Sequence, residues 1–308
     1  MPRTLMEAVK HFADLDRCHE YMKAMKWPDG KIACPKCNSE NVGDIKSRRI
    51  FQCKNKDCRK QFSVKVGTIF EDSPLGLDKW FVAAWSIANA KNGISSCELG
   101  RALGVTQKTA WFMLHRIRLA MRTTSFKEIM GEIEADETFI GGRAKNMHRN
   151  KRKAIGRGWV GKEIVHGLLE RTTADKPSRV DLAVIPNTRR PTVQKRVRER
   201  VAPGSSVYTD SLASYMGLAP NYAHDFVDHA IEYARGAVHT NGLENFWSLL
   251  KRTLRGTYVA VDPQHLSRYL DEQAYRFNDR KKSDSQRFAT VMARTPGKRL
   301  TYNQLVGA

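Results

Sequence analysis

The sequence lacks any apolar run long enough to span a membrane, and it lacks a basic amphipathic helix that would anchor it to a membrane surface. The opening residues, MPRTLMEAVKHFADLDRCHEYM, lack the unbroken apolar core of a signal peptide. We therefore expect a cytoplasmic protein without a membrane partner.

Acidic residues are scarce relative to basic ones. The 308 residues include 32 Asp and Glu against 53 Lys and Arg, which gives a formal net charge of +21. This excess causes self-repulsion in a compact fold, and it is typical of proteins that bind a polyanion such as nucleic acid. A basic protein without such a partner is the alternative.

Cysteine is also scarce, and four of the six cysteines form two close pairs. Cys34 and Cys37 stand in CPKC, and Cys53 and Cys58 stand in CKNKDC. Four thiolates brought together complete the tetrahedral shell of a structural Zn²⁺ ion and leave no position for water. We expect a zinc ribbon over residues 29–72, in which one metal ion stabilises a segment too small for its own core. Free cysteines or a redox pair are the alternatives.

The remaining pattern divides the chain into further segments. Residues 1–28 carry apolar residues at helical spacing up to the turn WPDG, and residues 73–125 are helical. Over residues 128–285, strand-like runs followed by helices predict an α/β domain with a mixed sheet. Residues 286–308 are expected to form a C-terminal tail. The fold class is therefore a multidomain α+β or α/β protein.

Residues 73–125 include a helix-turn-helix candidate, SSCELGRALGVTQKTAWFMLHRIRLAMR. Ser95 and Glu98 have capping-box spacing, Gly104 allows a tight turn, and Thr106 can cap a second helix. The second helix carries polar and cationic side chains of the types that contact bases and phosphates from the major groove. These candidate DNA contacts are Gln107, Lys108, His115 and Arg118. An ordinary packed helix pair is the alternative.

Three acidic residues stand at positions typical of a catalytic metal site. Asp136 lies in the strand-like run EADETFIGG, Asp210 ends a strand in VYTDSLASY, and Glu244 begins a helix. Ionised carboxylates in buried strands need a partner or a metal ion, and strand ends are where α/β folds assemble sites. Each acid also has an ordinary explanation. Asp136 can be a solvent-facing charge, as can Glu134 and Glu137, Asp210 can cap a turn, and Glu244 can complete a helix N-cap.

Metal chemistry would link the three acids. Two Mg²⁺ ions about 3.5–4 Å apart can activate an oxygen nucleophile and stabilise the leaving oxygen of a phosphodiester. Mg²⁺ prefers carboxylate oxygens, so acids from two strands and one helix suffice to hold it. An acidic cluster without metal would instead repel DNA.

The helix that begins near Glu244 carries cations on the same face. At 3.6 residues per turn, Lys251 returns to the face of Glu244, and Arg255 lies one turn further. The acid would hold a metal at the helix N-terminus, where the dipole favours its ionised form, while Lys251, Arg252 and Arg255 would contact DNA phosphates. The run GGRAKNMHRNKRKAIGR adds further candidate phosphate contacts, for which a solvated loop is the alternative. These are Arg149, Lys151, Arg152 and Lys153.

The motifs around the three acids, together with HTNGLENFWSLLKRTLRGTY and HLSRYLDEQAYRFNDR, resemble those of DDE-type transposases of bacterial insertion sequences. The stretch CHEYMKAMKWPDGKIACPKC resembles the start of the group that joins an N-terminal zinc ribbon to a ribonuclease H-like catalytic domain. This resemblance covers nearly the whole chain. It implies that Asp136, Asp210 and Glu244 hold two Mg²⁺ or Mn²⁺ ions and that Lys251 is the accompanying catalytic cation.

The resemblance also implies an activity. The enzyme would nick DNA at the 3′ ends of its element, and each freed 3′-hydroxyl would attack target DNA without a covalent protein–DNA intermediate. Its partners would be double-stranded DNA, namely the terminal inverted repeats and the target, and a homodimer or larger assembly would hold two ends. The residues alone leave two alternatives, a ribonuclease H-like nuclease or resolvase without strand transfer and a catalytically inert zinc-ribbon regulator.

Overall fold

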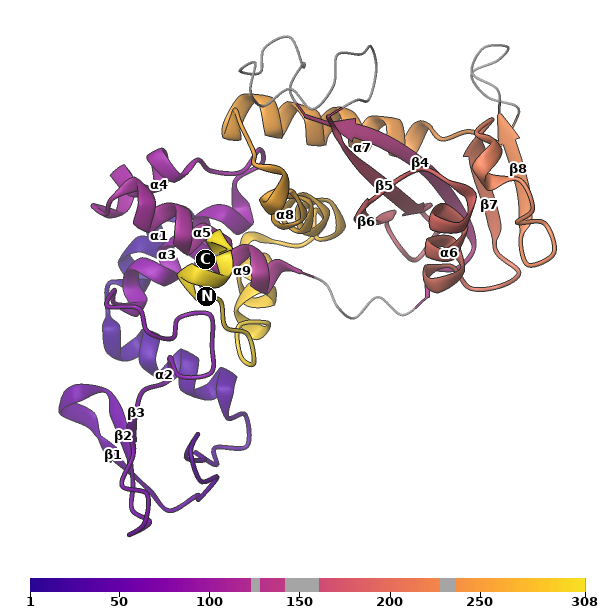
Figure 1. The fold of residues 1–308 in the computed structure, drawn as a ribbon. Coiled ribbons are helices and arrows are strands. Elements are labelled where there is room, and N and C mark those ends of the chain that lie inside the picture. Colours follow the sequence, from indigo (N-terminus) through magenta and orange to yellow (C-terminus); the bar gives the residue numbers. More distant parts are fainter. Residues whose placement is uncertain (123–127, 142–160, 228–235, 237, 308) are drawn as a thin grey trace. The chain divides into compact units, whose positions relative to one another are not determined.

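The computed structural model describes the chain except for residues 123–127, 142–160, 228–235, 237 and 308 (Figure 1). The chain forms two compact units. The first unit combines residues 1–122 with residues 282–308, and the second unit spans residues 123–281. No helix in the described parts of either unit is long and apolar enough to cross a membrane.

The first unit is mainly helical, with a small sheet inserted after its second helix (Figure 1). Its helices are α1 (Leu5–Phe12), α2 (Leu15–Lys26), η1 (Lys46–Arg48), α3 (Leu77–Asn89), α4 (Ser96–Leu103), α5 (Gln107–Met121), α9 (Asp284–Ala293) and α10 (Tyr302–Val306). The antiparallel sheet has the order β1 (Val42–Ile45), β2 (Ile50–Cys53) and β3 (Gln61–Phe62).

Aromatic residues from both ends of the chain form the core of this unit. The ring of Phe288 in α9 lies 5.0 Å from that of Phe12 in α1 and 5.6 Å from that of Trp85 in α3. The residues expected to form a C-terminal tail therefore complete the core instead. The physical reason is that Phe288, Val291 and Met292 share one face of α9 and are all buried.

The helix pair predicted from capping signals is present. Gly104 adopts a left-handed conformation with φ of 62° between α4 and α5. The Ser95 hydroxyl oxygen accepts from the N–H of Glu98 at 3.1 Å, and that of Thr106 accepts from the N–H of Thr109 at 3.2 Å. The predicted caps at Ser95 and Thr106 are therefore confirmed.

The second unit contains a mixed five-stranded sheet, as the sequence predicts. Its strands are β4 (Glu132–Ile140), β5 (Glu163–Glu170), β6 (Arg179–Ile185), β7 (Ser206–Asp210) and β8 (Ala223–Val227). Their order is β6-β5-β4-β7-β8, with β4, β5 and β6 antiparallel and with β7 and β8 parallel to β4. The helices of this unit are α6 (Arg190–Arg200), η4 (Ala213–Tyr215), α7 (Asn241–Thr253), the π-helix η5 (Leu254–Tyr258), η6 (Pro263–His265) and α8 (Leu266–Asn278).

Side chains alternate between the two faces of this sheet and separate two apolar layers. On one face, Val193 and Val197 of α6 pack with Leu168 of β5. On the opposite face, Leu243 of α7 and residues of α8 pack with Leu169 of β5. Helices α6 and α7 therefore cover opposite faces of the sheet. Each polar side chain of β4 points toward one of these two helices, according to its position along the strand.

Candidate functional site

The two candidate aspartates lie level with each other on adjacent parallel strands. The pairing of β4 with β7 runs up to Glu134 and Tyr208, so Asp136 and Asp210 each stand two residues beyond the last pair. Because alternate side chains share a face, both aspartates point to the face covered by α7. Neighbouring strands lie about 4.8 Å apart, so the sheet brings these two acids together beside that helix.

Glu244 joins the two aspartates from the first turn of α7. Burial chiefly raises the pKa of Asp136 to about 6, and the negative charges of Asp210 and Glu244 raise this pKa further. Hydrogen bonds from Trp247 and from the backbone of Glu137 act in the opposite direction. The three acids are therefore near enough to interact electrostatically, although they come from three separate elements.

The carboxylates are more widely spaced than the cysteine sulfurs. Among the described His, Cys, Asp and Glu residues, the four paired cysteines are the group whose donor atoms all lie within 4.8 Å of one another. The acids do not reach that mutual spacing. Ligands shared between two metal ions about 3.5–4 Å apart need not all approach one centre, so this arrangement is compatible with a two-metal site.

Two hydrogen bonds fix α7 against β4. The N–H of Leu243 donates to Glu134 at 2.9 Å, and the indole N–H of Trp247 donates to Asp136 at 2.8 Å. The two donor residues lie about one helical turn apart on α7, and the two acceptors lie two residues apart on one face of β4. These two hydrogen bonds set the position of α7 along β4 and, with it, the position of Glu244.

Two glycines allow this close approach. A Cβ atom at Gly167, which pairs with Asp136 across β4 and β5, would lie 2.6 Å from the ring of Trp247. A Cβ atom at Gly242 would lie 2.8 Å from a carboxylate oxygen of Glu134. A side chain at Gly167 would displace the Trp247 ring, and one at Gly242 would displace the Glu134 carboxylate that accepts from α7.

Glu134 is a structural acid and not a solvent-facing charge. Only 1% of its residue surface is exposed. The sequence-based interpretation of Glu134 as a solvent-facing charge is therefore wrong. Besides the N–H of Leu243, Glu134 accepts a hydrogen bond from Arg171 at 2.8 Å, and Arg171 also donates to the backbone oxygen of His239 at 2.8 Å. The buried carboxylate is therefore paired with a cation that also holds the residues before α7.

Glu137 points to the opposite face of β4, toward α6. It accepts a hydrogen bond from the buried Tyr215 hydroxyl at 2.6 Å, and it pairs across the strands with His166. Burial chiefly raises the pKa of Glu137 to about 8, while burial and the nearby Arg196 lower the pKa of His166 to about 3. Both side chains are therefore uncharged near neutral pH, and the sequence-based explanation of Glu137 as a solvent-facing charge is wrong.

Lys251 of α7 lies near the acids, as the helical spacing predicts. Lys251 is partly buried and Arg252 and Arg255 are exposed. Burial and the charges of Arg255 and Lys162 lower the pKa of Lys251, whereas Asp136 raises it. Lys162, immediately before β5, therefore lies near Lys251, although no spacing in the sequence indicates this. Four further candidate phosphate contacts lie outside the described residues: Arg149, Lys151, Arg152 and Lys153.

Two of the four candidate DNA contacts of the helix-turn-helix are corrected by the structure. His115 is 0% exposed and Arg118 is 1% exposed, so neither side chain is available to DNA in this conformation. The reason is that the C-terminal half of α5 packs against α3 and α9. Gln107 and Lys108, at the N-terminus of α5, are exposed.

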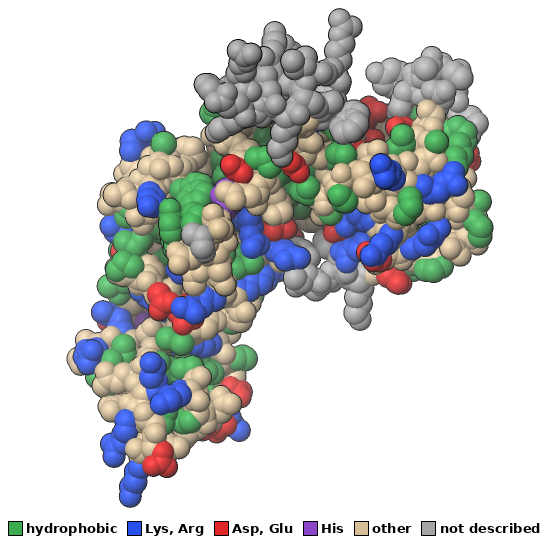
Figure 2. Space-filling view, viewed as in Figure 1, with side chains coloured by type: hydrophobic (Ala, Val, Ile, Leu, Met, Phe, Trp, Pro, Cys, Tyr) green, Lys and Arg blue, Asp and Glu red, His purple; other side chains and the backbone are tan. Residues whose placement is uncertain are grey.

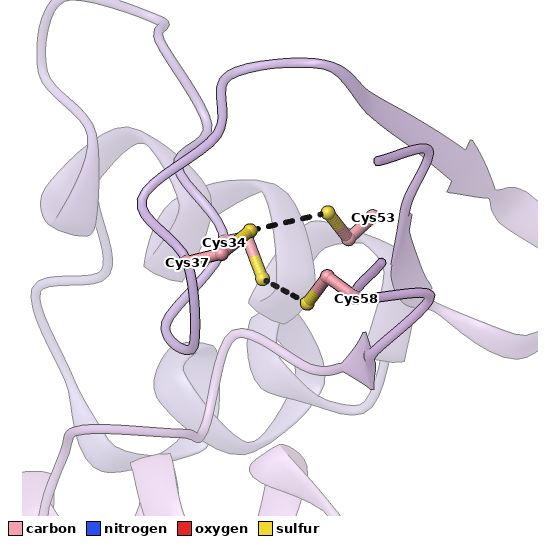
Figure 3. Close-up of side chains that lie close together, drawn as sticks. All are labelled: Cys34, Cys37, Cys53 and Cys58. Atoms are coloured by element: carbon pink, nitrogen blue, oxygen red, sulfur yellow. Dashed lines mark hydrogen bonds between the residues drawn. The ribbon is translucent and has the colours of Figure 1, made fainter. Parts of the chain in front are cut away.

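The paired cysteines form a preorganised metal centre (Figure 3). The sulfur atoms of Cys34 and Cys58 lie 3.7 Å apart, and those of Cys37 and Cys53 lie 3.6 Å apart. Tetrahedral Zn²⁺ with Zn–S bonds of about 2.3 Å requires sulfur separations of about 3.8 Å. The four residues therefore fit one structural Zn²⁺ ion.

The longer spacing of the second cysteine pair is absorbed by a local turn. The N–H groups of Cys58 and Arg59 both donate to the backbone oxygen of Asn55 at 3.1 Å, and Arg59 has a φ of 48°. A comparable turn closes the first pair, where the N–H of Asn38 donates to the backbone oxygen of Cys34 at 2.8 Å. Both pairs thus present their sulfur atoms to one point.

Family comparisons match both parts of the chain. Residues 128–278 match an ISXO2-like transposase domain, and residues 14–61 match a transposase zinc-ribbon domain. An uncharacterized protein in the transposable element ISH50 of Halobacterium salinarum is 28% identical over 283 residues, which is 86% of this chain and 91% of that protein. An uncharacterized transposase-like protein of Haemophilus influenzae is 34% identical over 102 residues, which is 33% of this chain and 82% of that protein.

One solved structure is similar over part of its length. It is the simian T-cell lymphotropic virus intasome in complex with the PP2A regulatory subunit B56 gamma. The TM-score is 0.27 and the identity 13%, over 61% of this chain and 66% of that chain, which is too low to inform the fold.

Proposed function

The chain belongs to the insertion-sequence transposases that carry an ISXO2-like DDE domain after an N-terminal zinc ribbon, and from this membership we propose that it nicks the 3′ ends of its element and joins them to target DNA. We assign residues 29–72 and 73–125 to recognition of the element ends. Residues 128–285 would carry catalysis.

The level placement of Asp136 and Asp210 beside Glu244 is the observation that supports this chemistry. Three carboxylates form the hard oxygen donor set that Mg²⁺ or Mn²⁺ prefers. When bound there, such ions would activate the attacking oxygen and stabilise the charge on the leaving oxygen. Trp247 would hold the Asp136 carboxylate in its orientation, and Lys251 would hold a DNA phosphate beside the acids.

Both proposed reactions are displacements at phosphorus. In the first, the oxygen of water bonds to phosphorus while the bond to the 3′-oxygen of the element breaks and that oxygen gains a proton. In the second, this 3′-hydroxyl loses its proton and bonds to a phosphorus of the target, whose own 3′-oxygen leaves. One phosphodiester replaces another in the second step, so no external energy source is needed. Two element ends must be held together while both are joined to the target, so we expect a homodimer or larger assembly on DNA.

The test uses the full chain, Mg²⁺ or Mn²⁺, labelled element ends and a supercoiled plasmid. We expect nicked ends followed by ends joined into the plasmid. Nicks without joining would indicate a nuclease or resolvase, and binding alone would indicate a regulator.

The variant Asp136→Asn should remove both products and retain DNA binding, because it removes a metal ligand and leaves the binding surfaces intact. Asp225→Asn, which changes an exposed aspartate on β8, is the matched control and should keep both products. Product formation by Asp136→Asn at the wild-type rate would refute the assignment of that residue.

A further inference from the structure

Backbone pairing between β4 and β7 stops before it reaches the candidate metal ligands. The last pair is Glu134 with Tyr208, two residues before Asp136 and Asp210. On their other sides, β4 stays paired with β5 up to Ile140, and β7 stays paired with β8 up to Asp210. Both strands therefore continue, but the ladder that holds them at a fixed distance from each other ends short of the two aspartates. The separation of these carboxylates depends on contacts other than main-chain pairing.

A buried side-chain hydrogen bond joins β4 to the segment that follows β7. The hydroxyl of Tyr215 donates to Oε1 of Glu137 at 2.6 Å. Glu137 directly follows Asp136 on β4, and Tyr215 lies in η4, which begins soon after Asp210. Because successive side chains of a strand point to opposite faces, this bond lies on the α6 face of the sheet, whereas the two aspartates point to the α7 face. The bond therefore links the two strands beyond the end of their ladder, on the face opposite the carboxylates.

Each end of this bond is coupled to one of the aspartates. The N–H of Glu137 donates to the carboxylate of Asp136 at 2.8 Å, so a shift of Glu137 also shifts this donor. The N–H of Leu212 donates to the carboxylate of Asp210 at 3.1 Å. The N–H of Tyr215 donates in turn to the backbone oxygen of Leu212 at 3.0 Å. A series of hydrogen bonds, linked through the residues that make them, therefore runs from one carboxylate to the other.

Helix α6 holds Tyr215 in place. The side-chain amide of Gln194 donates to the backbone oxygens of Ser214 at 3.1 Å and Met216 at 2.8 Å, one on each side of the tyrosine. Lys and Arg side chains gather over α6 in the space-filling view (Figure 2), whereas Tyr215 lies in the apolar layer beneath this helix and is 1% exposed. The bond to Glu137 is therefore shielded from water, where a hydrogen bond is electrostatically stronger.

We propose that Glu137 and Tyr215 are positioning residues that set the distance between Asp136 and Asp210 for the binding of divalent metal ions. The proposal rests on the function proposed above. Oxygen ligands of Mg²⁺ must lie about 2.0–2.1 Å from the ion, with a tolerance of about 0.2 Å. Without the bond, the ends of β4 and β7 could separate, and carboxylates that share metal ions would lose this spacing. Both residues point away from the metal face, so they act through the aspartates.

The main test measures Mn²⁺ binding to the full, zinc-loaded chain by electron paramagnetic resonance. Asp136→Asn identifies the Mn²⁺ bound at the acids, because this fraction should be lost in the variant. Tyr215→Phe keeps the buried ring and removes the hydroxyl, and its Mn²⁺ affinity at this site should fall at least about tenfold.

Tyr222→Phe is the matched control for this variant. Tyr222 lies in the same apolar layer, and its hydroxyl donates to the backbone oxygen of Val201 at 3.1 Å. The control also loses one buried hydrogen bond, so its urea midpoint should fall by a similar amount, but its Mn²⁺ affinity should stay within about twofold of wild type. An equal Mn²⁺ affinity for Tyr215→Phe and Tyr222→Phe would overturn the proposal, as would Mn²⁺ binding that Asp136→Asn leaves unchanged.

The acceptor side of the bond gives a second test. Glu137→Leu removes the acceptor and should lower Mn²⁺ affinity as Tyr215→Phe does. The double variant should bind no more weakly than either single variant, because both changes break the same link. Glu137→Gln provides an oxygen acceptor again and should recover most of the affinity. Losses that multiply in the double variant would show that the two residues act independently and would overturn the proposal.

The nicking assay separates this proposal from the function on which it rests. Nicking by Tyr215→Phe should require about tenfold more Mn²⁺ and approach the wild-type rate at saturating Mn²⁺, since the change weakens binding of the ions. If Tyr215→Phe weakens Mn²⁺ binding but the wild-type chain neither nicks nor joins DNA, the proposed function is refuted and the positioning role stands.

Discussion

The Asp136 carboxylate is held from two sides. One oxygen accepts from the backbone N–H of Glu137 at 2.8 Å, and the other accepts from the indole N–H of Trp247 at 2.8 Å. A carboxylate has about four acceptor positions, so each oxygen retains capacity for a metal ion. The orientation of this carboxylate therefore depends on a residue of α7 that carries no charge.

Trp247→Phe should weaken divalent metal binding while keeping the fold. Phenylalanine retains a ring against Gly167 but removes the N–H donor. Loss of a hydrogen bond that orients a metal ligand typically costs about 10–100-fold in metal affinity, so we expect half-maximal nicking to require at least about tenfold more Mn²⁺. A titration of nicking against Mn²⁺ measures this, with Trp111→Phe as the control. Equal Mn²⁺ requirements for the two variants would contradict the orienting role of Trp247.

Glu137 should make the stability of the second unit depend on pH. Its pKa is about 8 in the folded chain, against 4.5 for an ordinary glutamate. Between these values the folded state holds a proton that the unfolded state has released. The contribution of Glu137 to the free energy of unfolding is therefore fully present below pH 4.5 and is lost as the pH rises through 8. Glu137→Gln keeps an acceptor for Tyr215 without this ionisation and should flatten the dependence.

Urea unfolding midpoints at pH 5, 7 and 9 without added divalent metal check this prediction. The wild-type midpoint should fall toward pH 9, and the Glu137→Gln midpoint should fall less. Glu199→Gln, which changes an exposed acid, should follow the wild type. Parallel curves for wild type and Glu137→Gln would show that Glu137 is ionised in the folded state.

At the residue scale, the motifs point to Asp136, Asp210 and Glu244, but they do not reveal which neighbouring acids are structural. Glu134 and Glu137 stand on opposite faces of one strand, and both faces are covered by helices. Strand alternation separates these two residues, yet only the packed helices show that neither meets solvent. The prediction that His115 and Arg118 contact DNA is wrong for the converse reason, because the sequence shows their polarity but not the helices that cover α5.

At the scale of single elements, the zinc ribbon depends on its metal more than on its core. Its sheet consists of three short strands, of which β3 has two residues. Four cysteine sulfurs bring together the segment before β1 and the segment that runs from the end of β2 toward β3. Metal binding and folding of this segment should therefore be coupled.

Cys58→Ser should remove the bound zinc and unfold the ribbon. We expect about one zinc ion per wild-type chain and less than about 0.2 in the variant, since three thiolates leave the tetrahedral shell open. Elemental analysis gives the metal content, and proteolysis of residues 29–72 reports the loss of structure. Cys97→Ser changes an exposed cysteine outside the cluster and should retain the zinc. Zinc retention by Cys58→Ser would refute this ligand set.

Elements whose signals are local were predictable from the sequence. The caps at Ser95 and Thr106 involve residues three apart, and the cysteine pairs lie within a few residues of each other. The strand order was not predictable to this detail, because the pairing of β4 with β7 joins residues separated by two further strands and α6. The level placement of Asp136 and Asp210 follows from that long-range pairing.

At the scale of the whole molecule, the first unit is built from both ends of the chain. Phe288 of α9 is fully buried among Phe12, Phe81 and Trp85. The second unit is thus an insertion in the sequence of the first. The order of segments along the chain was visible in the sequence, but this closure was not, because it depends on contacts between residues near opposite termini.

Phe288→Ala should destabilise the first unit by about 3–5 kcal/mol, the usual cost of removing a buried aromatic ring. Because α5 also packs against α9, binding to element ends should weaken together with stability. Urea unfolding and a DNA-end binding assay measure the two effects. Tyr302→Ala removes a ring that is 37% exposed and should cost less than half as much. A Phe288→Ala chain as stable as wild type would show that α9 is dispensable for this core.

The discontinuous first unit also constrains the order of events during synthesis. Helices α1 to α5 leave the ribosome early, but the aromatic ring that completes their core arrives only after residues 123–281 have been made. At about 5–20 residues per second, this delay lasts roughly ten to thirty seconds. A nascent chain therefore remains without a finished DNA-recognition unit until translation is almost over, and the catalytic sheet can assemble first.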